Sequence, residues 1–196
     1  MASLYFHFAT MNAGKSSALI QAAYNYKERG MDVVIFKPRI DNRDGDGVEE
    51  VTSRIGLKAK ARLISLDEDL FEKVCVTLRE QQIHCVFVDE AQFLTPEQVR
   101  QLAKVVDIIK LPVMTYGLRS DFQGNLFPGS AALFATAQKL RPMVTICHCG
   151  SRATHVLRYN EEGEVVKEGP QVEIGGNDRY VAVCRKHHAE SMGYYD

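Results

Sequence analysis

The feature that most constrains the fold is a short segment, ATMNAGKS, at residues 9–16. It follows an apolar run, LYFHFA, and precedes an amphipathic segment that ends before Gly30. A glycine-rich turn between a strand and a helix is typical of a phosphate-binding loop, whose pattern is G-x-x-x-x-G-K-[S/T]. Only the first glycine of that pattern is missing, because Ala9 occupies its place. The segment therefore predicts a strand, a phosphate loop and a helix that open an α/β fold.

The end of the loop carries its chemistry. Backbone N–H groups would surround the phosphates, Lys15 would reach their β and γ oxygens, and the Ser16 hydroxyl would bind Mg²⁺. Gly14 stands where positive φ or close approach is most needed, and Ala9 is tolerable if its own φ is negative. The alternative is a Gly-Lys-Ser sequence at an ordinary helix start. The candidate ATP-binding residues of the loop are Ala9, Thr10, Met11, Asn12, Ala13, Gly14, Lys15 and Ser16.

Apolar runs alternate with amphipathic segments from the N-terminus to about residue 142. They predict strands at residues 4–9, 32–37, 61–66, 84–89 and 111–117. Helices are expected at residues 15–29, after a capping-box spacing at Ser65–Glu68, and from the N-cap Thr95 to about Lys110. This alternation favours a P-loop, RecA-like parallel sheet with helices on both faces and its sites at the carboxyl ends of the strands. Residues 1–142 are therefore expected to form the nucleotide-binding domain.

The remaining chain, residues 143–196, has a different residue pattern. Cysteines and histidines are interspersed with short alternating segments, which predict strands at residues 154–159, 164–169, 171–174 and 179–184. We expect a small β-rich second domain built from hairpins.

Composition excludes several classes of protein. The chain has 196 residues, 45% hydrophobic and 25% charged, with a formal net charge of −1. No apolar run approaches the ~18 residues of a membrane span, and the N-terminus lacks a basic leader, so we expect a cytoplasmic protein without a membrane partner. The near-neutral charge argues against a nucleic-acid partner. Five cysteines, an odd number, argue against a disulfide framework.

A second charged motif follows the strand predicted at residues 84–89. Asp89 ends that strand as a Walker-B aspartate does, where it would orient Mg²⁺ or its waters beside Ser16. Glu90 comes next, where a carboxylate could take a proton from the group that attacks the γ-phosphate. The alternative for Glu90 is a solvated acid after a strand.

The nature of that attacking group separates an ATPase from a kinase. The sequence Asp89-Glu90-Ala91-Gln92 is similar to the box of nucleic-acid helicases, but those need two such domains and a basic track. A kinase needs a dry, apolar pocket for its acceptor. Aromatic and apolar residues that would line such a pocket follow Glu90 in the sequence: Phe93, Leu118, Phe122 and Phe127.

The second domain carries a candidate metal site. Cys147 and Cys149 have a C-x-C spacing, and Cys184 and His187 a C-x-x-H spacing. Three thiolates and one imidazole form a tetrahedral, closed structural zinc site. His148 and His188 are expected to take no part. Buried free cysteines are the alternative, and we expect that state for Cys75 and Cys85.

Several segments together resemble the cytosolic-type, tetrameric, zinc-containing thymidine kinases. They are MNAGKS, VDEAQF, YGLRSDF, the paired C-x-C and C-x-x-H, and IGGNDRYVAVC. The match extends over essentially the whole chain. It implies that ATP and Mg²⁺ are used to phosphorylate the 5′-hydroxyl of thymidine or deoxyuridine in nucleotide salvage. It also implies a homotetramer and inhibition by thymidine triphosphate.

The resemblance assigns further positions. Glu90 matches the family's general base, and with Lys15 and Arg43 it would form the catalytic set. The segment IDNRD is similar to the family's Asp-x-Arg, which would link Asp41 to magnesium and set Arg43 against developing phosphate charge. Gln92 would join the nucleotide-binding residues. The nucleoside pocket and the flexible lasso over it would comprise Met11, Phe93, Leu118, Phe122, Phe127, Thr154, Gln171, Val172, Ile174, Gly175, Gly176 and Tyr180. Ala9 and the C-x-C depart from the glycine and C-x-x-C of many members.

Two other functions remain open at this point. One is an ATPase stimulated by nucleic acid, and the other is a zinc-stabilised nucleotide sensor without catalysis. Thymidine-dependent release of ADP would distinguish the kinase from the ATPase. The sensor would survive only if Glu90→Gln left an already negligible rate unchanged.

Overall fold

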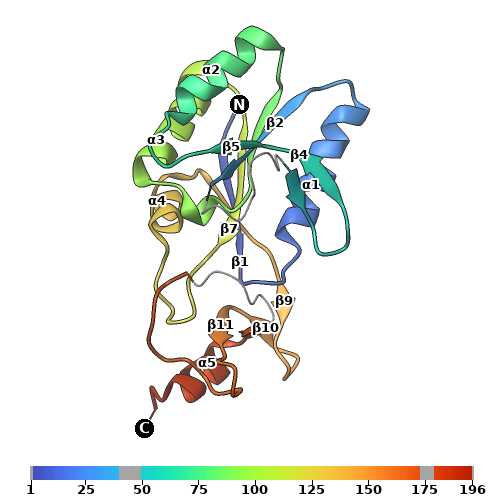
Figure 1. The fold of residues 1–196 in the computed structure, drawn as a ribbon. Coiled ribbons are helices and arrows are strands. Elements are labelled where there is room, and N and C mark those ends of the chain that lie inside the picture. The colour runs from blue at the N-terminus through green and yellow to red at the C-terminus, as the bar shows by residue number, and fades with distance from the viewer. Residues whose placement is uncertain (1, 40–49, 173–178, 196) are drawn as a thin grey trace.

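The computed structural model describes residues 2–39, 50–172 and 179–195 (Figure 1). Its helices are α1 Lys15–Glu28, α2 Leu70–Glu80, η1 Ala91–Phe93, α3 Pro96–Lys104, η2 Val105–Ile109, α4 Pro128–Thr136 and α5 Arg185–Met192, of which η1 is a 3₁₀ turn and η2 a π-helical continuation of α3. Its strands are β1 Leu4–Ala9, β2 Val33–Pro38, β3 Glu50–Thr52, β4 Lys58–Lys60, β5 Arg62–Ile64, β6 Cys85–Val88, β7 Val113–Leu118, β8 Lys139–Pro142, β9 Thr145–Ile146, β10 Arg152–Ala153, β11 His155–Arg158 and β12 Tyr180–Val183.

The main structural unit is a six-stranded sheet with the order β5-β2-β6-β7-β1-β8. Every pairing within it is parallel, as predicted. The strand that precedes the phosphate loop, β1, therefore lies beside β7, and β7 lies beside β6. Parallel pairing brings the carboxyl ends of these three strands to one edge of the sheet, where the loop and the acidic residues follow them.

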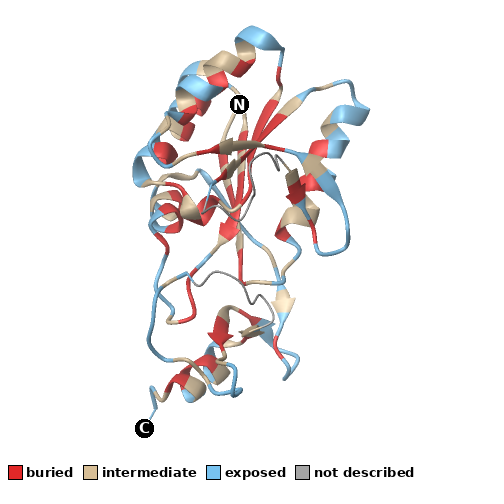
Figure 2. Ribbon diagram, viewed as in Figure 1, coloured by how far each residue is buried: buried red, intermediate tan, exposed pale blue. Residues whose placement is uncertain are grey.

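The sheet separates two apolar cores, which explains why its strands are nearly continuous apolar runs. One core contains Val86 and Val88 of β6 together with side chains from α2, α3 and α4. The other contains the alternate residues Cys85 and Phe87, packed with α1 and the β3–β4 hairpin. Figure 2 shows the buried residues concentrated in the sheet and on the inner faces of these helices. The prediction of helices on both faces is confirmed.

Helix starts follow local capping chemistry. Thr95 and Gln98 form the predicted reciprocal capping box at α3. The predicted box at Ser65 is wrong, because α2 begins later and is capped by Asp69, whose carboxylate accepts a hydrogen bond from the Glu72 N–H at 3.0 Å. Glu68 instead accepts a hydrogen bond from the Ser65 backbone N–H, which closes a turn before the helix.

The elements β3, β4, η1, α4 and β8 of this region were not predicted. The β3–β4 hairpin is short and mostly polar, and α4 begins after Phe127 without a side-chain cap. Strand β8 is exposed along its length, so it lacks the apolar character of the other sheet strands. Proline at the first position of α4 and the left-handed Gly56 between β3 and β4 are the local signals that mark two of these elements.

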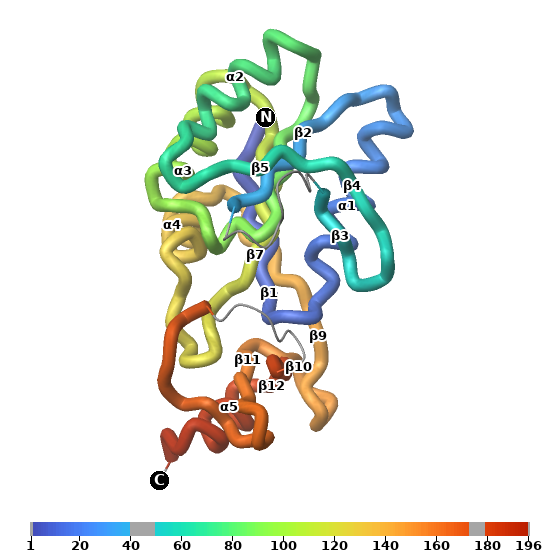
Figure 3. The backbone as a smooth tube through the Cα atoms, viewed as in Figure 1, coloured from blue at the N-terminus to red at the C-terminus, as the bar shows by residue number. Residues whose placement is uncertain are grey.

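The chain after β8 forms a smaller β-rich region. The pairs β9–β10 and β11–β12 are antiparallel, and α5 packs against β11 over a small core. Figure 3 shows this region, in orange and red, at the opposite end of the molecule from the N-terminus. Residues 164–169 were predicted as a strand, but they form only an isolated bridge between Val165 and Tyr159. No helix of the described chain has both the length and the apolar character to cross a bilayer.

The first turn of α4 packs tightly on the segment that follows β6. A Cβ atom at Gly129 would lie 2.6–2.7 Å from the carbonyl oxygens of Ala91, Gln92 and Leu94. We expect Gly129→Ala to lower the free energy of unfolding by about 1–3 kcal/mol, although alanine is favoured over glycine in helices by ~1 kcal/mol. Chemical denaturation measures the difference. Ala131→Ser, at an exposed position of α4, is the control and should change stability by less than about 0.5 kcal/mol. A more stable Gly129→Ala protein would contradict the close packing.

Candidate active site

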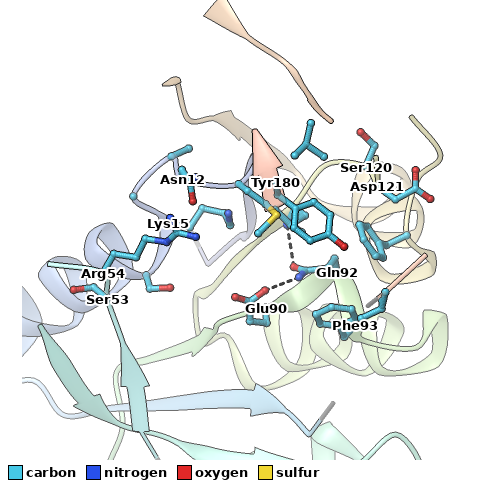
Figure 4. A pocket seen from close by; sticks show the side chains of 18 of the residues that line it. Asn12, Lys15, Ser53, Arg54, Glu90, Gln92, Phe93, Ser120, Asp121 and Tyr180 are labelled. Atoms are coloured by element: carbon cyan, nitrogen blue, oxygen red, sulfur yellow. Dashed lines mark hydrogen bonds between the residues drawn. The ribbon is translucent and has the colours of Figure 1, made fainter. Parts of the chain in front are cut away.

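A cavity of about 530 Å³ lies at the carboxyl ends of β1, β6 and β7. The phosphate loop forms one side of it and the residues after β6 and β7 form another. Figure 4 shows Glu90 and Gln92 between the cationic side chains of Lys15 and Arg54 and the aromatic ring of Phe93. The cavity therefore joins a phosphate-binding end to an apolar end.

The phosphate loop begins while the chain is still in the sheet. Ala9 pairs in register with Leu118, its carbonyl oxygen accepts a hydrogen bond from the Arg119 N–H at 2.9 Å, and its φ is not positive. Glycine is therefore not needed at this position. The left-handed conformations of the loop occur at Asn12, with φ of 63°, and at Gly14, with φ of 71°. Gly14 was the position predicted to need this freedom, and asparagine tolerates it better than most residues.

Lys15 is buried below the loop. Its Nζ donates a hydrogen bond to the Thr10 carbonyl oxygen at 3.1 Å. Burial lowers the pKa of the ammonium group, while the charges of Glu90 and Asp89 oppose that shift. The cation is thus held by the protein before any phosphate arrives.

Asp89 is buried beside Ser16. Its Oδ2 accepts a hydrogen bond from the Ser16 hydroxyl at 3.0 Å, while its buried Oδ1 has no hydrogen-bond partner among the described residues. Burial, with a further contribution from the Glu90 charge, raises the pKa of Asp89 to about 6. A hydroxyl beside an incompletely satisfied carboxylate is the oxygen-rich arrangement that Mg²⁺ prefers. Ser16 and Asp89 therefore fit the predicted metal-binding role.

Glu90 is half-buried and has a strained backbone. Its φ of 49° and ψ of 37° lie in the left-handed region, which is uncommon for a residue other than glycine. The Gln92 side-chain amide donates a hydrogen bond to Glu90 Oε2. Such backbone strain is found where the surrounding structure holds a functional residue in place.

The apolar end of the cavity contains the predicted aromatic residues. The rings of Phe93 and Phe127 meet edge to face, with centroids 5.6 Å apart. Phe122 is 1% exposed, and the Arg158 guanidinium carbon lies 3.9 Å from the centroid of its ring. Met11, Leu118 and Tyr180 also line this cavity, as expected.

The loop that carries Phe122 is fixed by buried polar groups. Asp121 is 4% exposed, and its Oδ1 accepts hydrogen bonds from the Gln123 and Asn125 backbone N–H groups. Its Oδ2 accepts a hydrogen bond from Gln171 Nε2 at 2.9 Å. The Phe122 carbonyl oxygen lies 2.8 Å from Nε2 of the buried His188. These contacts connect the pocket wall to the smaller C-terminal region.

Most of the described candidate residues are brought together by the fold. Gln171 and Val172 line the cavity. Thr154 does not, because it lies at a separate hollow beside the Cys/His cluster, where its hydroxyl is 3.0 Å from His155 Nδ1. The candidates outside the described residues are Asp41, Arg43, Ile174, Gly175 and Gly176.

Sequence reasoning missed one wall of the cavity. The β3–β4 hairpin contributes Ser53, Arg54 and Ile55, of which Arg54 lies near Lys15. No strand and no site residue is predicted for this segment from the sequence. The β11 residue Val156 and the buried Ser120 were also missed. Ser120 lies within the segment YGLRSDF, but no motif includes the hairpin residues or Val156, and only the fold places those at the cavity.

The predicted metal ligands form one cluster. The ligand atoms of Cys147, Cys149, Cys184 and His187 all lie within 4.8 Å of one another. His187 Nδ1 is 3.3 Å from Cys147 Sγ and 3.4 Å from Cys184 Sγ. The set of three thiols and one imidazole fits the tetrahedral preference of zinc. The His148 ring is tilted against the His187 ring, with centroids 4.3 Å apart, but His148 does not belong to the cluster.

We expect Asp89→Asn to stabilise the ligand-free protein at neutral pH. A raised pKa means that the folded state binds the Asp89 proton more tightly than the unfolded state. The resulting cost to stability is absent below the unfolded pKa of about 4, grows as the pH rises to about 6, and persists above it. The variant should therefore match the wild-type free energy of unfolding near pH ~4 and exceed it by about 1–3 kcal/mol above pH ~7.

Denaturant titrations across this pH range test the prediction. Asp67→Asn, at an exposed position, is the control for a carboxylate-to-amide change and should alter the free energy of unfolding by less than about 0.5 kcal/mol. Equal stabilities of Asp89→Asn and wild type at neutral pH would show that the buried carboxylate imposes no cost.

Comparison with known proteins agrees with the site. The family model described as thymidine kinase matches residues 2–188. The thymidine kinases of Mannheimia succiniciproducens and Pasteurella multocida are each 52% identical to this chain, over 98% of this chain and 98% and 99% of their own lengths. The thymidine kinase of Photobacterium profundum is 53% identical, over 98% of this chain and all of its own. The chain therefore belongs to the thymidine kinase family.

Proposed function

We propose that this protein transfers the γ-phosphoryl group of ATP to the 5′-hydroxyl of thymidine. The observation that carries the proposal is the position of Glu90, which lies between the phosphate loop and an apolar, aromatic cavity. A carboxylate at that junction can accept a proton from an acceptor hydroxyl while the aromatic residues exclude water. An ATPase would need water at the same position.

The phosphate end would bind ATP with Mg²⁺. Loop N–H groups and the buried Lys15 would hold the β and γ phosphates, and Ser16 and Asp89 would bind the metal or its waters. Mg²⁺ would neutralise charge that develops on the phosphate oxygens. Arg54 lies close enough to Lys15 to add positive charge at the mouth of the cavity. We propose the same role for Arg43, and a magnesium-linked role for Asp41.

The acceptor end would hold the nucleoside. The rings of Phe93, Phe122 and Phe127 offer apolar surfaces for the base and sugar. Gln171 and Asp121 are the polar groups of this wall, and their mutual hydrogen bond supports a role in orienting the ligand. Backbone groups at Val172, Ile174, Gly175 and Gly176, together with Tyr180, are proposed to close over the pyrimidine. Deoxyuridine would fit the same contacts.

Further parts of the proposal rest on family membership. They are a boundary between two domains at residues 142 and 143, a homotetramer, inhibition by thymidine triphosphate, and a cytoplasmic location. Thymidine triphosphate carries both a nucleoside and a phosphate chain, so it would occupy both ends of the cavity at once. This is a direct physical basis for inhibition.

Glu90→Gln tests the reaction. Because the amide cannot accept the proton, we expect kcat for thymidine phosphorylation to fall by about 10²–10⁴-fold, with little change in KM for ATP. A coupled ADP-release assay, run with and without thymidine, measures both constants. Glu162→Gln, at an exposed turn, is the control and should behave as wild type. Wild-type turnover that ignores thymidine but rises with single-stranded nucleic acid would overturn the kinase assignment.

We also propose that the Cys/His cluster binds one structural zinc ion. Cys184→Ser removes a ligand, so zinc content should fall and Tm should drop by several degrees, because metal binding contributes directly to folding. Elemental analysis and thermal unfolding measure the two effects. Cys75→Ser, outside the cluster on α2, should change neither the zinc content nor the thymidine kinase activity. Wild-type protein purified without chelators and lacking zinc would contradict the assignment.

A further inference from the structure

Gln92 is the most completely buried polar residue of the cavity, with 1% of its surface exposed. Its side-chain amide makes two hydrogen bonds. Oε1 accepts from the Leu118 backbone N–H at 2.9 Å, and Nε2 donates to Glu90 Oε2. Figure 4 shows both bonds as dashed lines. The amide thus connects the end of β7 to the carboxylate that follows β6.

The first of these bonds fixes the orientation of the amide. A backbone N–H group can only donate, so the oxygen of Gln92 must face Leu118 and the NH₂ group must face Glu90. A carboxylate can only accept, so the second bond is compatible with that one orientation alone. Because the Leu118 N–H belongs to the end of a strand in the sheet, a rigid element determines which atom meets Glu90.

Packing also limits movement of Gln92. A Cβ atom at Gly117 would lie 3.0 Å from both the backbone nitrogen and Oε1 of Gln92. On the other side, Gly129 of α4 approaches the Gln92 carbonyl oxygen with no room for a Cβ atom. The residue is therefore held between β7 and α4, and it has little freedom to adopt another rotamer.

Glu90 needs such a contact. Its left-handed backbone sets the direction in which the side chain leaves the chain, but a glutamate side chain retains three rotatable bonds. A hydrogen bond at Oε2 restrains the carboxylate and leaves Oε1 for a ligand, since no described residue donates a hydrogen bond to Oε1.

We propose that Gln92 is a positioning residue for phosphoryl transfer. Its amide is fixed by the Leu118 N–H and holds the Glu90 carboxylate so that Oε1 faces the acceptor hydroxyl. The inference rests on the proposed function, in which Glu90 is the general base. Gln92 has no proton to give or take in the reaction, so its effect is exerted through Glu90. Misplacement of a reacting group by about 1 Å is enough to reduce a rate by about 100-fold.

Two substitutions separate the parts of this contact. Gln92→Met keeps the approximate size and removes both hydrogen bonds. Gln92→Glu keeps the shape of the side chain and an oxygen that accepts from the Leu118 N–H, but it replaces the NH₂ group that donates to Glu90 with a carboxylate oxygen. This variant is the second test if Gln92→Met fails to fold. We expect both variants to lose about 10- to 100-fold in kcat, with KM for thymidine and for ATP changed less than about twofold because ligand binding is not affected.

Gln98→Met is the matched control. Gln98 is also 1% exposed, and its Nε2 donates to the Ser65 and Glu68 carbonyl oxygens, but it does not line the cavity. Its substitution should reduce the midpoint of thermal unfolding and leave kcat at the wild-type value when assayed well below that midpoint. A loss of kcat in Gln92 variants alone would therefore not be a general effect of removing a buried amide.

A double-mutant cycle decides whether Gln92 acts through Glu90. In the Glu90→Gln background, the orientation of a base no longer matters, so adding Gln92→Met should reduce single-turnover thymidine phosphorylation by less than about twofold. An equal loss in both backgrounds would overturn the proposal, because it would mean that Gln92 contacts ATP or thymidine directly. Wild-type kcat in Gln92→Met and Gln92→Glu would overturn it as well. Failure of the proposed function would be distinguishable, because the wild-type protein itself would then not phosphorylate thymidine.

Discussion

Parallel pairing of β6, β7 and β1 is the constraint on which the site depends. Strands that run in the same direction end at the same edge of a sheet, and neighbouring strands end within about 5 Å of one another. The phosphate loop after β1, the Leu118 N–H at the end of β7 and the carboxylates after β6 are distant in sequence, yet they meet for this reason. The two apolar cores on the faces of the sheet stabilise this pairing. The chemistry of the site is therefore an outcome of strand order and direction.

The same edge concentrates groups that are unfavourable in isolation. Burial lowers the pKa of Lys15 and raises the pKa of Asp89, so each group is shifted toward its neutral form. The attraction between Lys15 and the two acids opposes that shift, but Asp89 Oδ1 still lacks a hydrogen-bond partner among the described residues, and Glu90 keeps a left-handed backbone. These features lower the stability of the ligand-free fold. They also mean that the charges are in position before a substrate binds, so less reorganisation is needed during the reaction.

Much of this arrangement could be predicted from the sequence. The phosphate loop, Asp89, Glu90 and the four ligands of the Cys/His cluster belong to local patterns whose chemistry requires those residues at those spacings. The β3–β4 hairpin and its Arg54 could not be predicted, because three-residue strands carry no periodicity. The hydrogen bond between Gln92 and Leu118 could not be predicted either, because the partner is a backbone N–H group 26 residues away in the sequence. Thr154 was assigned by resemblance, yet the structure places it beside His155. Patterns locate chemical groups, whereas tertiary packing determines which of them share a cavity.

Arg158 of β11 joins two parts of the C-terminal region that are separated in sequence. Its guanidinium donates a hydrogen bond to the Pro170 carbonyl oxygen, and its backbone pairs with Tyr180 across the β11–β12 ladder. The two ends of the segment between Pro170 and Tyr180 are therefore fixed by one residue, which itself stacks on Phe122. Bringing the ends of a segment together has an entropic cost, and here that cost is met during folding. Val172 and Tyr180, which line the cavity on either side of that segment, therefore lie next to backbone that is already anchored to the wall carrying Phe122.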